Sequence, residues 1–459
     1  MKRCLLLTVT LALALACKPL PPRGAVPVEV ASGLPRLVLL PDDAQDRVVL
    51  SATVAAGSAY DPIGQEGLAF VTARAAVLAA SPDALPVSLD VGKDRVRFEV
   101  VCAPAQVERC ADRLIGALTT PRLDEVSRVV GREVASFSLN GLPPGSAALA
   151  SDVLDRWLFQ AHPYGHAVEG RAGALPLFTT AALKAFWTSH VVRASTVIGV
   201  SGPVSGPQLE ALMERLRALP SSLPPELVLM RPESITGRAL LVIDADAGST
   251  AIAAGAPLRA NVSDADDAAL VVAFAAFSAR GASVGGARDA FVGSPSGGAD
   301  TLGGVLAEPR QQGSWQVRAP SLAAGDAVEA TRALLADLER LVRDGLTQPE
   351  LDATRVVLQA VIAARRKDPT AALDAATDAL LAGTSDPLRL MPAALDALTL
   401  DQVNDALRRH VDPANVRVVA ATHGAQALAD AVQRSSAVGT GAAPLFGEVF
   451  VRSAADLAR

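Results

Sequence analysis

The sequence predicts an α+β protein made of two similar domains in tandem. Three observations predict it: the length of 459 residues, a long internal repeat, and strands and helices that do not alternate strictly. A chain of this length contains enough material for two or more hydrophobic cores. Strict alternation would instead indicate a doubly wound parallel sheet, so a sheet covered by helices fits each half better.

The internal repeat is clearest in two segments near the ends of the halves. FTTAALKAFWTSHVVRASTVIGV begins at Phe178 and LTLDQVNDALRRHVDPANVRVVA begins at Leu398, and the two align without a gap. Each copy is typical of a helix, a short turn and a buried strand. A second echo pairs RVVGREV at 128–134 with RVVLQAV at 355–361. A unit of roughly 200 residues is too long for a solenoid repeat, which indicates two whole domains.

Strand patterns and linker composition place the domain boundaries. VVLSATVAAGS and RVRFEVVC predict strands in a first domain over residues 30–220, and ALLVIDADAG and SWQVRAP predict strands in a second over 237–430. The proline-rich connector at 221–236 breaks helices. Residues 431–459 read as a loop-like C-terminal tail, in which a lone GTG without a strand-to-helix context does not indicate a phosphate site.

Residues 1–16 are typical of a signal peptide. Lys2 and Arg3 precede the apolar run LLLTVTLALALA, which is short for a membrane span. The ALAC that follows resembles a bacterial lipoprotein signal, with Cys17 as the lipidated first residue and 17–29 as a linker. The residue after Cys17 is Lys18 rather than aspartate, which resembles the signal for outer-membrane sorting in Gram-negative bacteria. We therefore expect a periplasmic, outer-membrane-anchored lipoprotein. The alternative is ordinary cleavage near Ala16 and a soluble exported protein.

Composition and cysteine usage narrow the function classes. The net charge is −6, no long basic run is present and aromatic residues make up 3% of the chain, which excludes nucleic acid as a partner. No other apolar segment is long enough to cross a bilayer. Cys102 and Cys110 flank a strand-to-helix turn. Export permits a disulfide between them, and two buried free thiols are the alternative.

Four landmarks carry a family resemblance. They are AGSAYDPIGQEGLA at 56–69, HPYGHAVEG at 162–170, the helix and strand that begin at Phe178, and DGLTQPELDATRVVL at 344–358. Together, over about residues 30–430 of the chain, they resemble the pitrilysin/insulinase-like zinc peptidases, the inverzincins. The resemblance implies two homologous domains, each a mostly antiparallel sheet covered by helices, that form a clam shell around a peptide.

The resemblance also locates a zinc site that this chain has lost. Active members carry H-x-x-E-H on the helix after GLA, where two histidines on one helix face hold Zn²⁺ and the glutamate activates water. Here Phe70, Ala73 and Arg74 occupy those positions, and none of them can ligate a metal. Glu133 falls at the third-ligand position. It is a relic, an ion-pair partner of Arg74, or a solvated carboxylate. We expect no catalytic residue, no metal ligand and no bound zinc.

The substrate-contact residues implied by the resemblance are also altered. Arg288 corresponds to an arginine that binds the substrate carbonyl, but its tyrosine partner has no counterpart because Tyr60 and Tyr164 both lie in the first half. The edge strand that takes up peptide in the family carries Asn-Ala-x-Thr, where this chain has SLDV at 88–91.

The histidines favour structural roles. His162 and His166 are four residues apart, but the proline and glycine between them prevent the helical geometry of a metal pair. His190 and His410 lie at equivalent positions near helix ends, where a histidine can complement the helix dipole.

The sequence suggests three alternative functions. The first is a non-catalytic lipoprotein subunit that pairs with an active insulinase/pitrilysin-like chain to enclose peptides. The second is a stand-alone peptide-binding or scaffold lipoprotein, and the third is a zinc endopeptidase with an atypical site. A neighbouring H-x-x-E-H chain would favour the first over the second.

Overall fold

A computed structural model describes most of the chain. The described residues are 26–28, 33–42, 45–78, 85–140, 147–228, 231–245, 249–258, 264–280, 289–293, 313–437 and 444–457. Cys17, Arg288 and the GTG at 439–441 lie outside these ranges.

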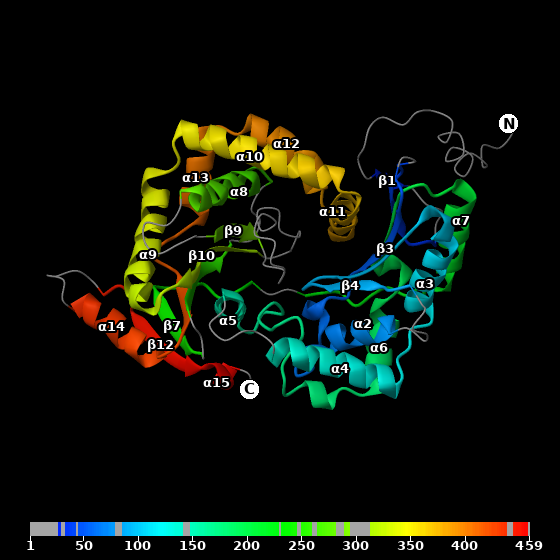
Figure 1. The fold of residues 1–459 in the computed structure, drawn as a ribbon, viewed down its shortest axis with the longest axis horizontal. Coiled ribbons are helices and arrows are strands. Elements are labelled where there is room, and N and C mark those ends of the chain that lie inside the picture. Colours follow the sequence, from blue (N-terminus) through cyan, green and yellow to red (C-terminus); the bar gives the residue numbers. More distant parts are fainter. Residues whose placement is uncertain are drawn as a thin grey trace.

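The first half forms a six-stranded sheet in the order β1-β2-β6-β3-β5-β4 (Figure 1). Its strands are β1 Val26–Val28, β2 Arg36–Leu40, β3 Val48–Val54, β4 Ser88–Val91, β5 Val96–Cys102 and β6 Thr196–Ser201. The pair β2–β6 is parallel and the other neighbouring pairs are antiparallel. The small strand β4 is therefore an edge of the sheet.

The second half repeats this sheet in the order β12-β7-β11-β8-β10-β9. Its strands are β7 Ala239–Asp244, β8 Thr250–Pro257, β9 Asp289–Gly293, β10 Ser314–Leu322, β11 Arg417–Thr422 and β12 Glu448–Ser453. Both neighbours of β7 are parallel to it, and the remaining pairs are antiparallel. The predicted α+β class, with mostly antiparallel sheets, is confirmed.

Helices pack on both sheets. In the first half they are α2 Leu68–Val77, α3 Val107–Thr119, α4 Glu125–Asn140, α5 Ala147–Phe159, α6 Thr180–His190 and α7 Gly206–Arg215. In the second they are α8 Asp264–Ala279, α9 Ala327–Asp344, α10 Gln348–Lys367, α11 Pro369–Ala382, α12 Pro387–Ala397, α13 Leu400–His410, α14 Ala425–Ala437 and the short α15 Ala454–Leu457.

The repeat read from the sequence recurs in the structure. α6 and α13 are each eleven residues long and end at the paired histidines. Each is capped by a threonine, Thr179 or Thr399, whose side chain accepts a hydrogen bond from a backbone N–H of the first turn. The buried strands β6 and β11 follow them. The same local chemistry therefore starts and stops the equivalent helices.

The predicted C-terminal boundary at residue 430 differs from the structure. The segment taken as a loop-like tail continues α14 to Ala437 and then forms β12, which pairs with β7 along its whole length. β12 takes the edge that β1 takes in the first sheet. Its alternation of exposed and half-buried residues is a weak signal in a segment rich in glycine and alanine.

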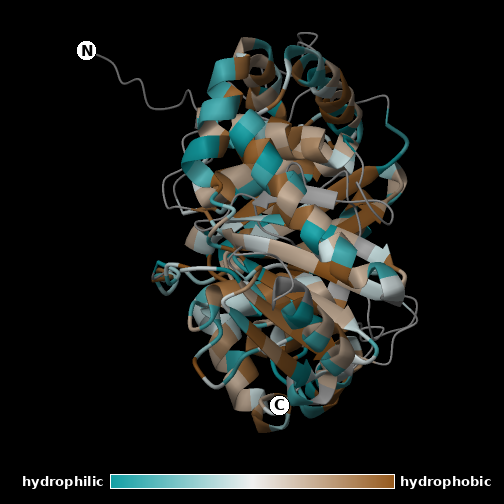
Figure 2. Cartoon of the chain, turned by 90° about the vertical axis from the view of Figure 1, so that its left-hand side faces the viewer, coloured by the Kyte–Doolittle hydropathy of each residue, from teal (hydrophilic) through white to brown (hydrophobic). Residues whose placement is uncertain are grey.

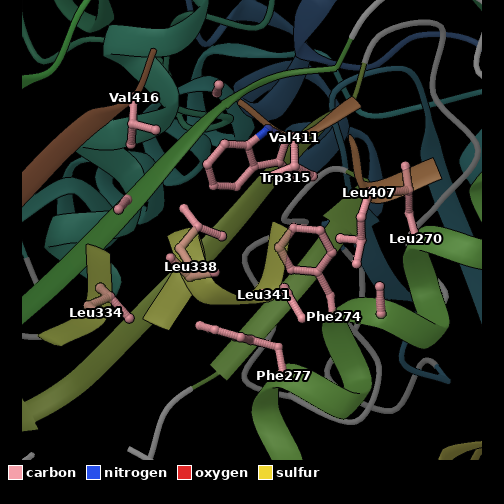
Figure 3. Packing of buried hydrophobic residues seen from close by; sticks show 14 of the residues in the cluster. Leu270, Phe274, Phe277, Trp315, Leu334, Leu338, Leu341, Leu407, Val411 and Val416 are labelled. Carbon is pink, nitrogen blue, oxygen red and sulfur yellow. The ribbon is translucent and has the colours of Figure 1, made fainter. Parts of the chain in front are cut away.

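Each half has its own hydrophobic core between sheet and helices. In the second half, Phe274 and Phe277 of α8 pack with Trp315 of β10 and with leucines of α9 such as Leu338 (Figure 3). The first half has an equivalent core around Phe98 and Trp187. Figure 2 shows largely hydrophobic strands behind helices that carry both hydrophilic and hydrophobic residues.

The halves also exchange one helix each. α5 of the first half packs on β8, β10 and β11 of the second sheet, and α11 of the second half packs on β2, β3 and β6 of the first (Figure 1). Leu154 and Val153 of α5 are buried against Ile243 and Val419. This exchange covers the one face of each sheet that the helices of its own half leave open.

Candidate functional site

The helix that resembles a catalytic helix is α2, and its start is fixed by the lead-in loop. Gly67 has a φ of 101°, a left-handed conformation that favours glycine. The Asp61 carboxyl group accepts hydrogen bonds from the backbone N–H groups of Gly67 and Ala69, both at 2.7 Å. Burial raises the pKa of Asp61 to about 8, against the effect of these two hydrogen bonds.

The HPYGHAVEG segment packs directly on this helix start. Gly170 also has a left-handed φ, of 93°. A Cβ on Gly67 would lie 2.4 Å from the Glu169 carbonyl oxygen, and one on Gly170 would lie 2.0 Å from the Glu66 carbonyl oxygen. Both positions therefore exclude any side chain, and two of the landmark motifs are joined by a contact between backbones.

Packing residues stand at the three positions where the resemblance predicts the zinc motif. The side chains of Phe70 and Ala73 are buried in the core of the first half. The Arg74 guanidinium carbon lies 5.2 Å from the centre of the Phe70 ring, a cation–π contact. Burial lowers the pKa of Arg74, and the nearby carboxylates of Glu169 and Asp90 act to raise it. Arg74 thus places a cation at a position where the resemblance predicts a metal ligand.

Glu133 does not pair with Arg74. It lies on α4 with an exposed side chain, and among the described residues no ion pair or hydrogen bond of its carboxylate is found. The two helices do run side by side, because Gly131 brings α4 close to α2. A Cβ there would lie 2.7 Å from the Val71 carbonyl oxygen. Of the three alternatives for Glu133, the ion pair with Arg74 is not formed, and the solvated carboxylate fits the exposure of its side chain.

The two histidines of HPYGHAVEG are buried in a polar loop. His162 Nδ1 accepts a hydrogen bond from the Tyr164 N–H at 3.0 Å, and the Tyr164 hydroxyl donates to Asp94 at 2.7 Å. Burial, with a smaller effect of the Lys93 charge, lowers the pKa of both His162 and His166 to about 4. They are therefore neutral near pH 7 and hold the loop through backbone contacts.

The residues present do not fit a zinc ion. Within the described part of the chain, no three His, Cys, Asp or Glu side chains come together in a way that could hold a metal. A structural zinc takes four N, S or O ligands, and a catalytic zinc takes three. Glu133 alone cannot replace them.

The predicted structural role of the paired helix-end histidines holds with a different cause. Burial lowers the pKa of His190, whose ring stacks on Phe186 at 4.1 Å, so packing rather than a positive charge fixes it. His410 Nε2 lies 2.8 Å from the Asp266 carboxylate and ties α13 to α8. Outside its own helix, the His190 ring meets the Tyr60 ring edge to face, with 5.4 Å between the ring centres.

Two further predicted features are located. Cys102, at the end of β5, and Cys110, in α3, are joined as a disulfide. SLDV at 88–91 is β4, and β4 is the edge strand of the first sheet. Asp90 on this strand pairs with Arg95 at 2.8 Å. Burial acts to raise the pKa of Asp90, but the guanidinium groups of Arg95, Arg97 and Arg74 together lower it.

The structure brings together one group of charges that the sequence analysis missed. Arg97 of β5 and Arg95, the residue just before β5, meet Asp374 and Asp378 of α11 from the other half, and Asp90 of β4 joins them. We call these five residues the interdomain charge cluster. Arg97 lies 2.9 Å from Asp374 and 2.5 Å from Asp378, and Arg95 lies 2.8 Å from Asp378. The sequence signal for this cluster was a pair of aspartates four residues apart on one helix and a pair of arginines two residues apart at the start of a strand.

Comparisons with known proteins bear on this arrangement. No family model matches the sequence, and no curated protein matches it. Solved structures do match. The peptidase M16 inactive domain from Pseudomonas fluorescens has 18% identity and a TM-score of 0.73, over 86% of this chain and 97% of that one. M16 is the class of the pitrilysin/insulinase-like peptidases.

Two other matches come from larger proteins or assemblies. The first half of the periplasmic protease PqqL from Escherichia coli has 13% identity and a TM-score of 0.68, over 93% of this chain and 100% of that one. A chain of complex III2 from Candida albicans, with Inz-5 bound, has 13% identity and a TM-score of 0.67, over 84% of this chain and 93% of that one.

The chain has the M16 peptidase fold. The predicted resemblance and the clam-shell architecture are confirmed at the level of fold, over most of the chain. α2 is the helix on which the resemblance predicts H-x-x-E-H, and the edge strand β4 contacts it. Among the described residues, no helix is long and apolar enough to cross a membrane.

The backbone contact between the two landmark motifs gives a stability prediction. Gly67→Ala should destabilise the protein by about 1–3 kcal/mol, because the new Cβ meets backbone and the left-handed φ disfavours alanine. Gly116→Ala is the matched control. Gly116 lies inside α3 with nothing near its Cβ, so alanine there should stabilise by about 0.4–1 kcal/mol. Urea unfolding measures both, and equal effects would contradict the packing argument.

Proposed function

We propose that this chain is a non-catalytic subunit that pairs with an active zinc peptidase of the same fold and helps it to enclose peptides. The observation that carries the proposal is the content of α2. The helix is held in place by the lead-in loop and HPYGHAVEG, yet it presents Phe70, Ala73 and Arg74. The scaffold is retained while the groups that could bind a metal and activate water are replaced.

The matched structures support a role in a larger assembly. In PqqL this fold is the first half of a longer protease, and in complex III2 it is one chain of a complex. Both cases are properties of those proteins. They motivate the partner, because they show that a unit of this fold can work beside another unit.

Exposed apolar residues at equivalent positions of both halves also support a partner. Val129 and Val130 on α4 are 42% and 38% exposed, and Val356 and Val357 on α10 are 65% and 55% exposed. They are the paired valines of the RVV echo. Single exposed apolar residues are ordinary, but the same pair exposed twice fits a partner that is itself built from two equivalent halves.

Pairing can be measured by sedimentation of this chain mixed with an H-x-x-E-H chain from the same cell. We expect a one-to-one complex. The double variant Val129→Asp/Val356→Asp should weaken it about tenfold or more, because charge replaces apolar contact on both halves. Leu223→Asp, at an 85% exposed residue of the connector, is the control and should bind like the wild type. A chain that stays monomeric with the active protein would favour the stand-alone peptide-binding or scaffold lipoprotein.

Metal content tests the loss of the zinc site. Mass spectrometry of the chain purified in the presence of zinc should find almost none. The variant Phe70→His/Ala73→Glu/Arg74→His places two imidazoles on one face of α2. With Glu133 of the adjacent α4 as the third ligand that the resemblance implies, it should retain about one zinc per chain. One tightly held zinc in the unmodified chain would instead support the endopeptidase with an atypical site.

We also propose that the chain is exported and anchored to the outer membrane through lipid on Cys17. The observation behind this is the ALAC sequence after the apolar segment, since acyl chains bind membranes by burying methylene groups, at about 0.8 kcal/mol each. Cells labelled with radioactive palmitate should yield a labelled protein, and Cys17→Ser should abolish the label while Cys4→Ser should not. Label-free wild-type protein would favour the soluble exported form.

A further inference from the structure

The interdomain charge cluster connects three elements from both halves. Arg95 and Arg97 are nearly buried, with side chains 6% and 7% exposed. The side chain of Asp378 on α11 is 9% exposed and forms ion pairs with both arginines. Asp90 on the edge strand forms an ion pair with Arg95. Charges taken out of water are destabilising unless opposite charges lie close, so the balance of positive and negative groups in this cluster affects how stably α11 packs on the first sheet.

The balance in the cluster is uneven. Two guanidinium groups face three carboxylates, and Asp374 is the least compensated of the three. Among the described residues its guanidinium partner is Arg97 at 2.9 Å, whereas Asp378 lies against Arg95 and Arg97 together. Asp374 is also a neighbour of two like charges, Asp378 and Glu99.

The electrostatic consequence is a carboxyl group that titrates near neutrality. Burial raises the pKa of Asp374 to about 7, and the charges of Asp378 and Glu99 act in the same direction, against Arg97 and Arg95. Burial also raises the pKa of Glu99.

The charged groups around Asp374 come from both halves of the chain. The charges that act on it are those of Asp378 on its own helix, of Arg97 and Glu99 on β5 and of Arg95 just before β5. Asp90 of β4 lies 3.8 Å from Arg97, while Arg36 of β2 and Thr53 of β3 contact other residues of α11. Arg36 donates to the Leu380 carbonyl oxygen at the far end of α11, and Thr53 meets Thr377 at 3.3 Å. Arginines and threonines do not change protonation near pH 7, so the carboxyl groups carry the titration.

We propose that the interdomain charge cluster is a proton-dependent clamp between the two halves, in which a proton bound by Asp374 strengthens the packing of α11 on the first sheet. Removal of that proton leaves three negative carboxylates against two arginines and weakens this packing. The edge strand is coupled to it, because Arg95 is shared between Asp378 on α11 and Asp90 on β4.

The direction of the pH effect follows from linkage. When α11 is detached, Asp374 is exposed and has its ordinary pKa of 3.8. The docked state therefore binds the proton more tightly, so docking is strengthened as pH falls from 7 toward 4 and is weakened as pH rises through 7. Between pH 8 and pH 6 the docking equilibrium should change by about tenfold.

Hydrogen–deuterium exchange of the purified chain tests the clamp without any partner or metal, so its outcome is separate from that of the proposed function. Protection of α11 amides at pH 6.0 and 8.0, corrected for the intrinsic exchange rate, should be about tenfold higher at pH 6.0. Amides of β4 should change in the same direction.

The variants decide whether Asp374 is the responsible group. Asp374→Asn cannot take up the proton, so its protection should be the same at both pH values. Asp405→Asn, at an exposed aspartate of α13, should keep the wild-type response. Asp374→Ser replaces the asparagine variant if that one does not fold. A wild-type chain with equal or lower protection at pH 6.0, or an Asp374→Asn chain that keeps the response, overturns the proposal.

Discussion

The structure depends on the exchange of α5 and α11 between the halves. A six-stranded sheet has two faces, and the helices of each half cover one of them. The other face of each sheet carries residues such as Val38 and Val197 in the first half and Leu241 and Val419 in the second. These would meet water without the helix supplied by the other half. Burial of this surface, worth roughly 25 cal/mol per Å², holds the two halves in one arrangement.

Around α2, the backbone packing does not depend on which side chains stand at the positions where the resemblance predicts zinc ligands. Gly67, Gly170 and Gly131 set how closely α2 meets the HPYGHAVEG loop and α4, and each is required because a Cβ would strike backbone. Those constraints remain whether or not a metal is present. The ligand positions have no such constraint, so they can be filled by Phe70 and Ala73, which add to the core.

The exchange places apolar and charged contacts on the same helix, α11. Leu373 and Ala376 supply apolar burial against the first sheet, while Asp374 and Asp378 reach Arg97 at the start of β5. Apolar contact is indifferent to pH, whereas a buried carboxylate is not. α11 therefore carries both the apolar contacts that hold the halves together and the carboxyl groups that we propose modulate this packing with pH, beside the edge strand β4.

The sequence alone determined the fold class, the duplication and the absence of metal ligands on α2. These are encoded locally, in the periodicity of apolar residues, in the threonine caps and in which residue types stand at the zinc positions. The tertiary structure decided the strand β12, the exposure of Glu133, the neutral packing of His190 and the pairing of Arg97 with Asp374. Arg97 and Asp374 are far apart in the chain, and their contact arises because α11 crosses to the other sheet, which no local pattern records.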